Sequence, residues 1–446
     1  MVRQLTEHVV VPFQGEGSGL GELTWGQLEI LPIMQRDDAS FSIGGWMPLP
    51  EGCTPADVAG DLRFIMSRHA SLRTRLWFSA EGHPLQLVAE SGEAMLEVVD
   101  AGDADPEQIA MALYRRYDEK AFDWSCEWPI RWAVVVSGGA ASYLVSVISH
   151  LAADGTGVMA VLDDLRSRDP VTGQAKGPVT ALQPLELARL QAAPAALRQS
   201  DAALRYWGGL LRKIPARRFG GVAEERQPRY WQAFYDSPAS YLAVQAVAAR
   251  TGAGTSTVLL AAYAVALAQV TDSNPAVIQA VVSNRFRRGF AEVVSPLTNF
   301  GLCVIDVADI TFDEAVARAW RSTMRAYKYA YCDPAKRAEL VARISRERGE
   351  DVDLACFVND RRMQSRKEPD TRPPETADLR AALPQSALTW GYRTDDERER
   401  CYLHINNVPG TIQFELLGDT QCVSRSDIEA LLRGIEVAVT GAVLER

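Results

Sequence analysis

The sequence of 446 residues lacks the signatures of several protein classes. Its seven cysteines are scattered, none forms a C-x-x-C pair, and only five histidines accompany them. Neither a disulfide scaffold nor a metal site is therefore expected. The chain also has no Walker loop and no G-x-G-x-x-G, which are the usual nucleotide-binding signatures. A reduced, cytoplasmic protein with no bound metal or other fixed cofactor is predicted.

Basic charge and long apolar runs are also scarce. The 47 Lys and Arg residues stand against 57 Asp and Glu residues, so the net charge is −10. A nucleic-acid partner is not expected, because phosphate binding needs a basic surplus or patch. The longest apolar stretch, Thr257 to Val270, is shorter than the roughly 20 residues of a membrane span. The N-terminus has no secretory h-region, so no membrane association is predicted.

Helix-like and strand-like segments alternate along the chain, which favours an α/β or α+β fold over a bundle or a sandwich. The first clear helix is preceded by Thr54 as a candidate N-cap, with Pro55 at the first helical position. Gly138-Gly139 separates two β-branched runs, which predicts a hairpin. Ser200 is a candidate cap for a later helix. The predicted helices include 56–66, 200–211, 256–270 and the C-terminal end, and the predicted strands include 129–137, 143–149, 277–283, 401–408 and 411–418.

Two segments suggest how the chain is divided. The stretch 168–182 is rich in Pro, Gly and Thr, as expected of a connection between lobes. We therefore predict an N-terminal lobe over 1–172 and a C-terminal lobe over 173–446. The polar, Pro-rich stretch 364–384 is predicted to be a loop or a crossing segment of the second lobe.

The sharpest chemical feature is the segment SHLAADG, residues 149–155. An apolar strand ends at His150, and Asp154 with Gly155 then turns the chain into a helix. A histidine at such a strand end is suited to acid–base chemistry near neutral pH. Glycine lets a ligand approach the backbone, and helix N-terminal amides stabilise negative charge. The alternative interpretation is structural, with Asp154 capping the helix and His150 bonding a backbone carbonyl.

This segment resembles the HHxxxDG motif of condensation domains of nonribosomal peptide synthetases, within the chloramphenicol-acetyltransferase-like superfamily. Further family motifs resemble this chain in the same order. Their matches are LTWGQ at 23–27, RHASLRTR at 68–75, GHPLQ at 82–86, FDWSCEWPIR at 122–131, the block 255–285 that ends in Asn284-Arg285, and Asn299-Phe300-Gly301. The resemblance covers the chain nearly from end to end.

The resemblance implies two acetyltransferase-like lobes arranged as a V-shaped pseudo-dimer, with a tunnel between them and His150 near its middle. Phosphopantetheine arms of carrier proteins then bring the substrates. His150 matches the motif histidine that acts as general base or positions the nucleophile. Asp154 matches the structural aspartate, for which Arg285 is the candidate partner. Gly155 matches the glycine beside which the thioester arm passes.

The sequence departs from the family pattern at two places. Ser149 stands where the motif has its first histidine. SPLTNFG replaces the family's GxFxN floor-loop motif, so Asn299 and Gly301 are candidate floor-loop residues. No adenylation, carrier or thioesterase domain is recognisable beside the motifs, and a free-standing, monomeric member is expected.

We therefore predict a stand-alone acyltransferase of natural-product biosynthesis, in a nonribosomal peptide or peptide–polyketide hybrid pathway. It would join a carrier-bound acyl or aminoacyl thioester to an amine or an alcohol. Peptidyl or acyl carrier proteins would be its transient partners. Two alternatives stay open. One is a non-catalytic condensation-like module that binds a carrier or another partner. The other is an acyltransferase that uses soluble CoA thioesters.

Overall fold

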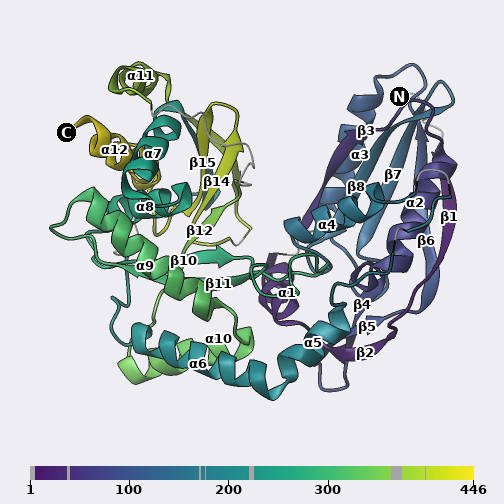
Figure 1. Ribbon diagram of the computed structural model, residues 1–446, viewed down its shortest axis with the longest axis horizontal. Coiled ribbons are helices and arrows are strands. Elements are labelled where there is room, and N and C mark those ends of the chain that lie inside the picture. Colours follow the sequence, from purple (N-terminus) through teal and green to yellow (C-terminus); the bar gives the residue numbers. More distant parts are fainter. Residues whose placement is uncertain are drawn as a thin grey trace. The chain divides into compact units, whose positions relative to one another are not determined.

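The computed structural model describes residues 6–37, 41–169, 172–175, 177–219, 226–362, 374–396 and 398–445. The chain forms two compact units, each a mixture of helices and β-sheet (Figure 1). Unit 1 comprises Met1–Leu197 together with Ser283–Thr298, and unit 2 comprises Arg198–Val282 together with Asn299–Arg446. The predicted mixed α/β class is confirmed.

Unit 1 contains a five-stranded sheet of order β1-β6-β7-β8-β3 and a three-stranded sheet of order β2-β5-β4. In the larger sheet only β6 and β7 are parallel neighbours. Helices α2 and α4 cover the apolar side chains of one face, and α3 covers the other. The elements are β1 (Thr6–Gln14), β2 (Gly19–Glu22), α1 (Trp25–Asp37), β3 (Ser42–Pro48), α2 (Pro55–Arg68), a 3₁₀ turn (Ala70–Arg73), β4 (Thr74–Phe78), β5 (Pro84–Val88), β6 (Ser91–Asp100), α3 (Pro106–Glu119), β7 (Ile130–Ser137), β8 (Ala140–Ser149), α4 (Gly155–Arg166) and α5 (Pro184–Ala192).

Helix α6 (Pro194–Leu211) runs across the boundary into unit 2. Unit 2 is built on one seven-stranded sheet of order β11-β10-β12-β14-β15-β9-β13. Helices α7, α8 and α12 pack on one face of this sheet and form the largest core of the chain (Figure 1). The elements are β9 (Tyr230–Ser237), α7 (Pro238–Thr251), α8 (Thr255–Thr271), β10 (Ala276–Val282), β11 (Asn299–Ile305), α9 (Phe312–Ala330), α10 (Pro334–Arg348), β12 (Cys356–Asp360), α11 (Thr376–Ala382), a 3₁₀ turn (Leu383–Gln385), β13 (Ala387–Thr394), β14 (Cys401–Val408), β15 (Thr411–Asp419) and α12 (Arg425–Leu444).

Local signals in the sequence predict several elements correctly. Thr54 caps α2 in a reciprocal capping box with Asp57. Gly138 and Gly139 both have positive φ and join β7 to β8 as a tight hairpin. The apolar run of α8 is buried on most sides, as expected.

Other predicted features differ from the structure. Ser200 is not an N-cap, because α6 already begins at Pro194. The Ser200 hydroxyl instead lies buried and accepts a hydrogen bond from the Asp333 amide at 3.1 Å. Within the predicted loop 364–384, residues 364–373 lie outside the described part of the chain. The stretch Thr376–Ala382 forms helix α11, because Glu375 and Asp378 make a capping box at its start.

The boundary between the units also lies later than the predicted change at 172–173. Helix α5 packs within unit 1, because the Gln183 side chain accepts a hydrogen bond from the Ala70 amide at 2.9 Å. Leu185 lies so close to strand β2 that a Cβ on Gly21 would be 2.8 Å from its side chain. These contacts are long-range in sequence, and composition alone does not reveal them.

Among the described residues, no single helix is long and apolar enough to cross a membrane. Helices α7 and α8 meet the length and composition criteria only when taken as a pair, and they are bent by 110° relative to each other.

Candidate active site

His150 lies at the open end of the β3–β8 ladder. Ser149, the last residue of β8, pairs with Ser42, and the backbone N–H of His150 then donates to the carbonyl of Phe41 at 2.9 Å. The Phe41 ring stacks on the imidazole, with 5.2 Å between ring centroids and 28° between the planes. His150 is partly exposed, whereas Ser149 is fully buried. Strand pairing therefore sets the backbone position of His150, and the Phe41 ring packs against its imidazole.

Phe41 has a backbone conformation that is unusual for its residue type. Its φ of +38° lies in the left-handed region, which bulky residues rarely adopt. Such outliers persist only where the surroundings enforce them, and they cluster at functional sites. The backbone and the ring of Phe41 both contact His150, and the sequence analysis did not identify this residue.

Asp154 joins the start of α4 to the segment 283–298. As the N-cap of α4, its Oδ1 accepts a hydrogen bond from the Gly157 amide at 2.8 Å. The same oxygen forms an ion pair with Arg285 Nη2, and Oδ2 accepts from the Leu297 amide at 3.1 Å. Both side chains of the ion pair are less than a tenth exposed. The structure thus brings together Asp154 and Arg285, which are 131 positions apart.

Arg285 organises the segment Ser283–Thr298, which belongs to unit 1 although unit 2 strands flank it in sequence. This segment has no helix or strand. The Arg285 guanidinium donates to four of its backbone carbonyls, those of Phe290, Ala291, Val293 and Ser295, at 2.9–3.3 Å. One guanidinium therefore binds four backbone carbonyls that, in a helix or a strand, would bind backbone amides.

The LTWGQ motif supports this segment from the side of α1. The Thr24 amide donates to the Gln27 side chain at 2.8 Å, and the Gln27 amide donates to the Thr24 hydroxyl at 3.2 Å. A Cβ on Gly26 would lie only 1.8 Å from the Pro296 carbonyl oxygen. The motif thus caps the start of α1, and its glycine lets α1 pack closely on Pro296. Pro296 directly precedes Leu297, whose amide binds Asp154.

The RHASLRTR motif anchors the other end of helix α4. Arg68 makes two hydrogen bonds to the Asp164 carboxylate, at 2.7 and 2.9 Å, and His69 Nε2 lies 3.0 Å from it. Burial acts to raise the pKa of Asp164, but the contacts with His69 and Arg68 outweigh burial and hold this pKa well below its usual value. Two carboxylates, at the start and near the end of α4, therefore fix the helix that follows His150.

Gly155 is exposed at the first position of α4. Within the described part of the chain, no atom lies within 4 Å of the point that a Cβ on Gly155 would occupy. At Gly157 the same point lies 3.3 Å from Arg285 Nη2. The two glycines of the turn therefore differ: Gly155 leaves open space at the backbone, and Gly157 makes room for the ion pair.

The condensation-domain family model matches residues 30–349. The chain belongs to the condensation domain family. Members of this family form amide or ester bonds in natural-product assembly and work with carrier-bound substrates. No curated protein sequence matches the chain.

Solved structures show the same fold at low sequence identity. The condensation domain that mediates chain release from the enacyloxin polyketide synthase aligns with a TM-score of 0.72 and 19% identity, covering 97% of this chain and 84% of that one. SgcC5 from Streptomyces globisporus aligns with a TM-score of 0.70 and 17% identity, covering 94% and 99%. The X-domain from teicoplanin biosynthesis aligns with a TM-score of 0.69 and 18% identity, covering 95% of both chains. The predicted acetyltransferase-like fold class is confirmed.

This condensation domain departs from the family pattern at Ser149 and in the SPLTNFG segment, and the residues concerned, Ser149, Asn299 and Gly301, are buried. Ser149 is fully buried, and its hydroxyl accepts a long, local hydrogen bond from the Leu151 amide at 3.4 Å. Asn299 and Gly301 lie in strand β11 of unit 2, not in a loop, and pair in register with β10. A Cβ on Gly301 would lie 3.0 Å from Ala326 of α9, so this glycine permits close packing of a helix on the strand.

The candidate site thus has two linked parts in unit 1: Phe41 contacts His150 at the end of β8, and the segment 283–298 holds Asp154 at the start of α4. Among the described residues, no group of three or more His, Cys, Asp or Glu side chains is placed to hold a metal ion. The arrangement presents one partly exposed imidazole four residues before the N-cap of α4, a helix whose first residue leaves open space.

Proposed function

We propose that this condensation domain catalyses acyl transfer from a thioester to an amine or an alcohol, as a stand-alone enzyme of natural-product biosynthesis in the cytoplasm. The observation that carries the proposal is local. The partly exposed His150 lies five residues before Gly155, the first residue of α4, which leaves open space. The buried Asp154 carboxylate and the partly buried Asp164 carboxylate hold that helix.

The chemistry that we assign is modest. The acceptor N–H or O–H loses its proton to His150 as its lone pair attacks the thioester carbonyl. The C–S bond then breaks, and the departing sulfur takes the proton back. A thioester is already activated, so orientation and a single base supply much of the required acceleration. Amides at a helix N-terminus can stabilise an oxyanion, and of those in the first turn of α4 the Gly157 amide is already bound by Asp154.

We assign the other residues supporting roles. Asp154 and Arg285 hold the loop that follows His150, and Gly155 leaves room for the phosphopantetheine arm of an acyl or peptidyl carrier protein. No resident cofactor is needed, since the arm enters with the substrate. Ser149 points into the core, so its replacement of a histidine removes no group from the exposed side of His150.

Intact-mass spectrometry tests the proposal. The purified protein is mixed with acyl-loaded carrier proteins and a panel of amines and alcohols, beside His150→Ala and a control, His83→Ala. His83 is half-exposed in unit 1, and its Nε2 lies 2.7 Å from the exposed Glu22 carboxylate. Transfer that the wild type and His83→Ala perform, and His150→Ala does not, supports the assignment. Equal transfer by His150→Ala would overturn the role of His150.

A second candidate function is a non-catalytic module that recruits a partner. Two observations favour it: the motif is incomplete at Ser149, and one structural neighbour is a complex of the X-domain with OxyB from teicoplanin biosynthesis. Carrier binding without transfer from any tested donor would support this function. Turnover of a soluble acyl-CoA without a carrier would instead support a CoA-dependent acyltransferase.

A further inference from the structure

Helix α9 of unit 2 has two contrasting faces. Its inner face packs on β11 and α8 through small residues such as Ala315, Ala319 and Ala326. Its outer face carries Trp320, Arg321, Met324, Arg325 and Lys328, which we call the α9 outer face. These positions fall within one side of a helix with 3.6 residues per turn. The helix therefore presents an aromatic ring, a thioether and three cations together.

The apolar members of the α9 outer face are unusually accessible. Trp320 is 51% exposed and Met324 is 44% exposed, one helical turn apart. Isolated exposed apolar residues are ordinary, but Trp, Met and Arg together are the residue types enriched at protein interfaces. Truncating such a Trp or Arg commonly causes the largest losses of binding energy.

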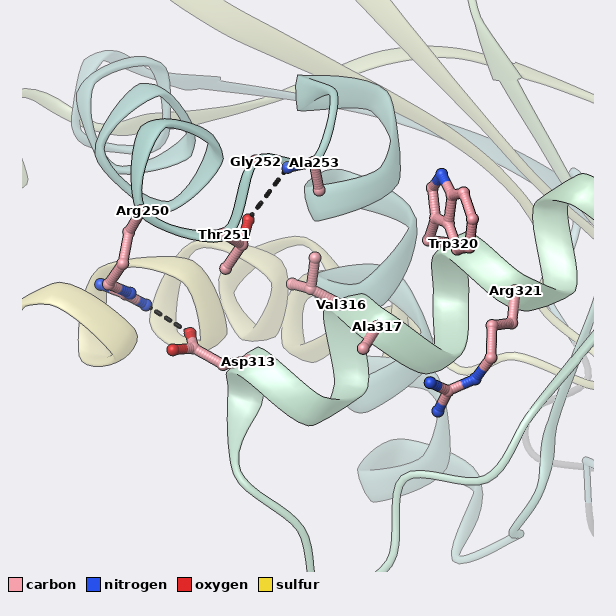
Figure 2. Close-up of a pocket in the computed structure, with 9 residues that line it drawn as sticks. All are labelled: Arg250, Thr251, Gly252, Ala253, Asp313, Val316, Ala317, Trp320 and Arg321. Carbon is pink, nitrogen blue, oxygen red and sulfur yellow. Dashed lines mark hydrogen bonds and ion pairs between the residues drawn. The ribbon is translucent and has the colours of Figure 1, made fainter.

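A pocket of about 460 Å³ opens beside Trp320 (Figure 2). Its walls are the turn between α7 and α8, with Gly252 and Ala253, and the first half of α9, with Val316 and Ala317. In Figure 2 the Trp320 ring stands up from α9 on one side of this pocket. The Arg250–Asp313 ion pair, 2.6 Å long, lies on the opposite side. Small apolar residues and the Trp320 ring thus share the lining with Thr251, Arg321 and the Arg250–Asp313 ion pair, which suits one apolar side chain with polar neighbours.

The charge of this face is opposite in sign to that of the chain. Arg321 shares Glu314 with Arg318. Arg325 and Lys328 form no ion pair within the described part of the chain. The whole protein has a net charge of −10. Two uncompensated cations next to exposed apolar groups therefore favour a partner with carboxylates around an apolar centre.

We propose that the α9 outer face docks an acidic amphipathic helix of a partner protein. An apolar side chain of that helix enters the pocket beside Trp320, another covers Met324, and its carboxylates face Arg325 and Lys328. The spacing of Trp320 and Met324 by one turn matches apolar residues at i and i+4 of a helix laid along α9. This docking surface goes beyond the proposed acyl transfer and does not depend on turnover.

A concave pocket distinguishes this partner from an anionic membrane. A helical partner can insert a side chain into this pocket, whereas a lipid surface would cover only the protruding Trp320 and Met324. A second copy of this acidic chain could dock only through a locally acidic helix, so self-association is a separate outcome of the test.

The probe is a fluorescein-labelled helical peptide of about 18 residues, the length that spans α9 at 1.5 Å per residue. It carries leucine at i, i+4 and i+7, a few glutamates beside the leucines, and alanine elsewhere to keep it helical. One control peptide has lysine in place of glutamate, and another has the leucines dispersed around the helix. Fluorescence anisotropy measures the Kd for each peptide, and phosphatidylglycerol vesicles are tested by co-sedimentation.

We expect the acidic amphipathic peptide to bind and both control peptides to bind at least about tenfold more weakly. Trp320→Ala and the double variant Arg325→Glu with Lys328→Glu should each weaken binding about tenfold or more, and added salt should weaken wild-type binding. The double variant changes only exposed side chains, so it remains informative if Trp320→Ala unfolds. Val437→Ala and Arg343→Glu, which alter exposed side chains on other helices, are the matched controls.

Three results would overturn the proposal. One is equal binding of the lysine peptide or of the dispersed-leucine peptide. Another is an unchanged Kd in the α9 variants. The third is a partner of another kind: binding to vesicles without binding to the peptide, or a dimer in solution that Trp320→Ala dissociates while the peptide does not bind.

Discussion

The ion pair between Asp154 and Arg285 permits a quantitative prediction. Asp154→Asn keeps an oxygen that can cap α4 but removes the charge opposite Arg285. Removing one partner of a buried pair costs about 3–5 kcal/mol, because the other charge stays buried without compensation. Arg285 is 8% exposed in its side chain and fixed by four carbonyls, so it cannot readily move to water. Asp154→Ala also removes the cap, which is worth about 0.5–2 kcal/mol.

A loss of about 3–5 kcal/mol corresponds to about 6–20 °C in melting temperature, at about 2–4 °C per kcal/mol for a unit of this size. Differential scanning calorimetry measures the shift in the transition of unit 1. The matched control is Asp163→Ala, which removes a 70%-exposed partner of Arg166 on the same helix and should cost at most about 1 kcal/mol.

The reasoning fails if Asp154→Asn melts within about 2 °C of the wild type. The pair would then add nothing beyond a surface contact. If instead both Asp154 variants melt early but retain full turnover well below their transitions, Asp154 is structural only, as we assign it. Loss of turnover in a fully folded Asp154→Asn would give this residue a direct part in the chemistry.

Three further changes probe other features. Phe41→Gly should alter the melting temperature little, because glycine relieves the left-handed backbone and so offsets the lost packing. The same variant should lower kcat about tenfold or more, whereas Phe41→Tyr, which keeps a ring, should retain kcat. An unaltered kcat in Phe41→Gly would refute the positioning of His150 by Phe41. Gly155→Leu should melt like wild type, since its side chain meets open space, but lose acyl transfer; normal transfer would show that the arm passes elsewhere. Burial, and to a smaller extent the nearby Arg361 guanidinium, holds the pKa of His404 well below its usual value. Below about pH 6.5, His404 therefore gains a proton in the unfolded chain but not in the folded one. Stability should fall there, and His404→Gln should flatten that fall in urea titrations; an unchanged pH slope would contradict this.

The sequence could predict what depends on neighbouring residues. Thr54 with Pro55, the two glycines after Ser137 and the apolar run of α8 each act within a few positions, and each element formed where they indicate. Ser200 does not cap a helix, because a residue type that caps well can also serve as a buried hydrogen-bond acceptor inside a helix. Local propensity is a weak prior wherever tertiary packing provides a better partner.

In the candidate site, too, the sequence reveals some residues and leaves others to be found in the fold. The motif in the sequence points to His150, Asp154 and Gly155, and the family resemblance points to Arg285. Phe41 and Asp164 carry no comparable signal, because their partners lie 109 and 95 positions away along the chain. Their importance becomes visible only when the β3–β8 ladder and the packing of α2 on α4 bring those partners together. The role of Gly26 likewise depends on Pro296, which only the fold places against it.

The membership of Ser283–Thr298 in unit 1 has a consequence for protein engineering. Leu197 is an attractive recombination point, because it separates the first long block of unit 1 from unit 2. Recombination there would take Asp154 from one parent and Arg285 from the other. Hybrid synthetases built in this way would mismatch the buried ion pair, the Leu297 amide and the Gly26 contact all at once. A viable exchange of unit 1 therefore needs two inserts, residues 1–197 and residues 283–298, transferred together from a single donor.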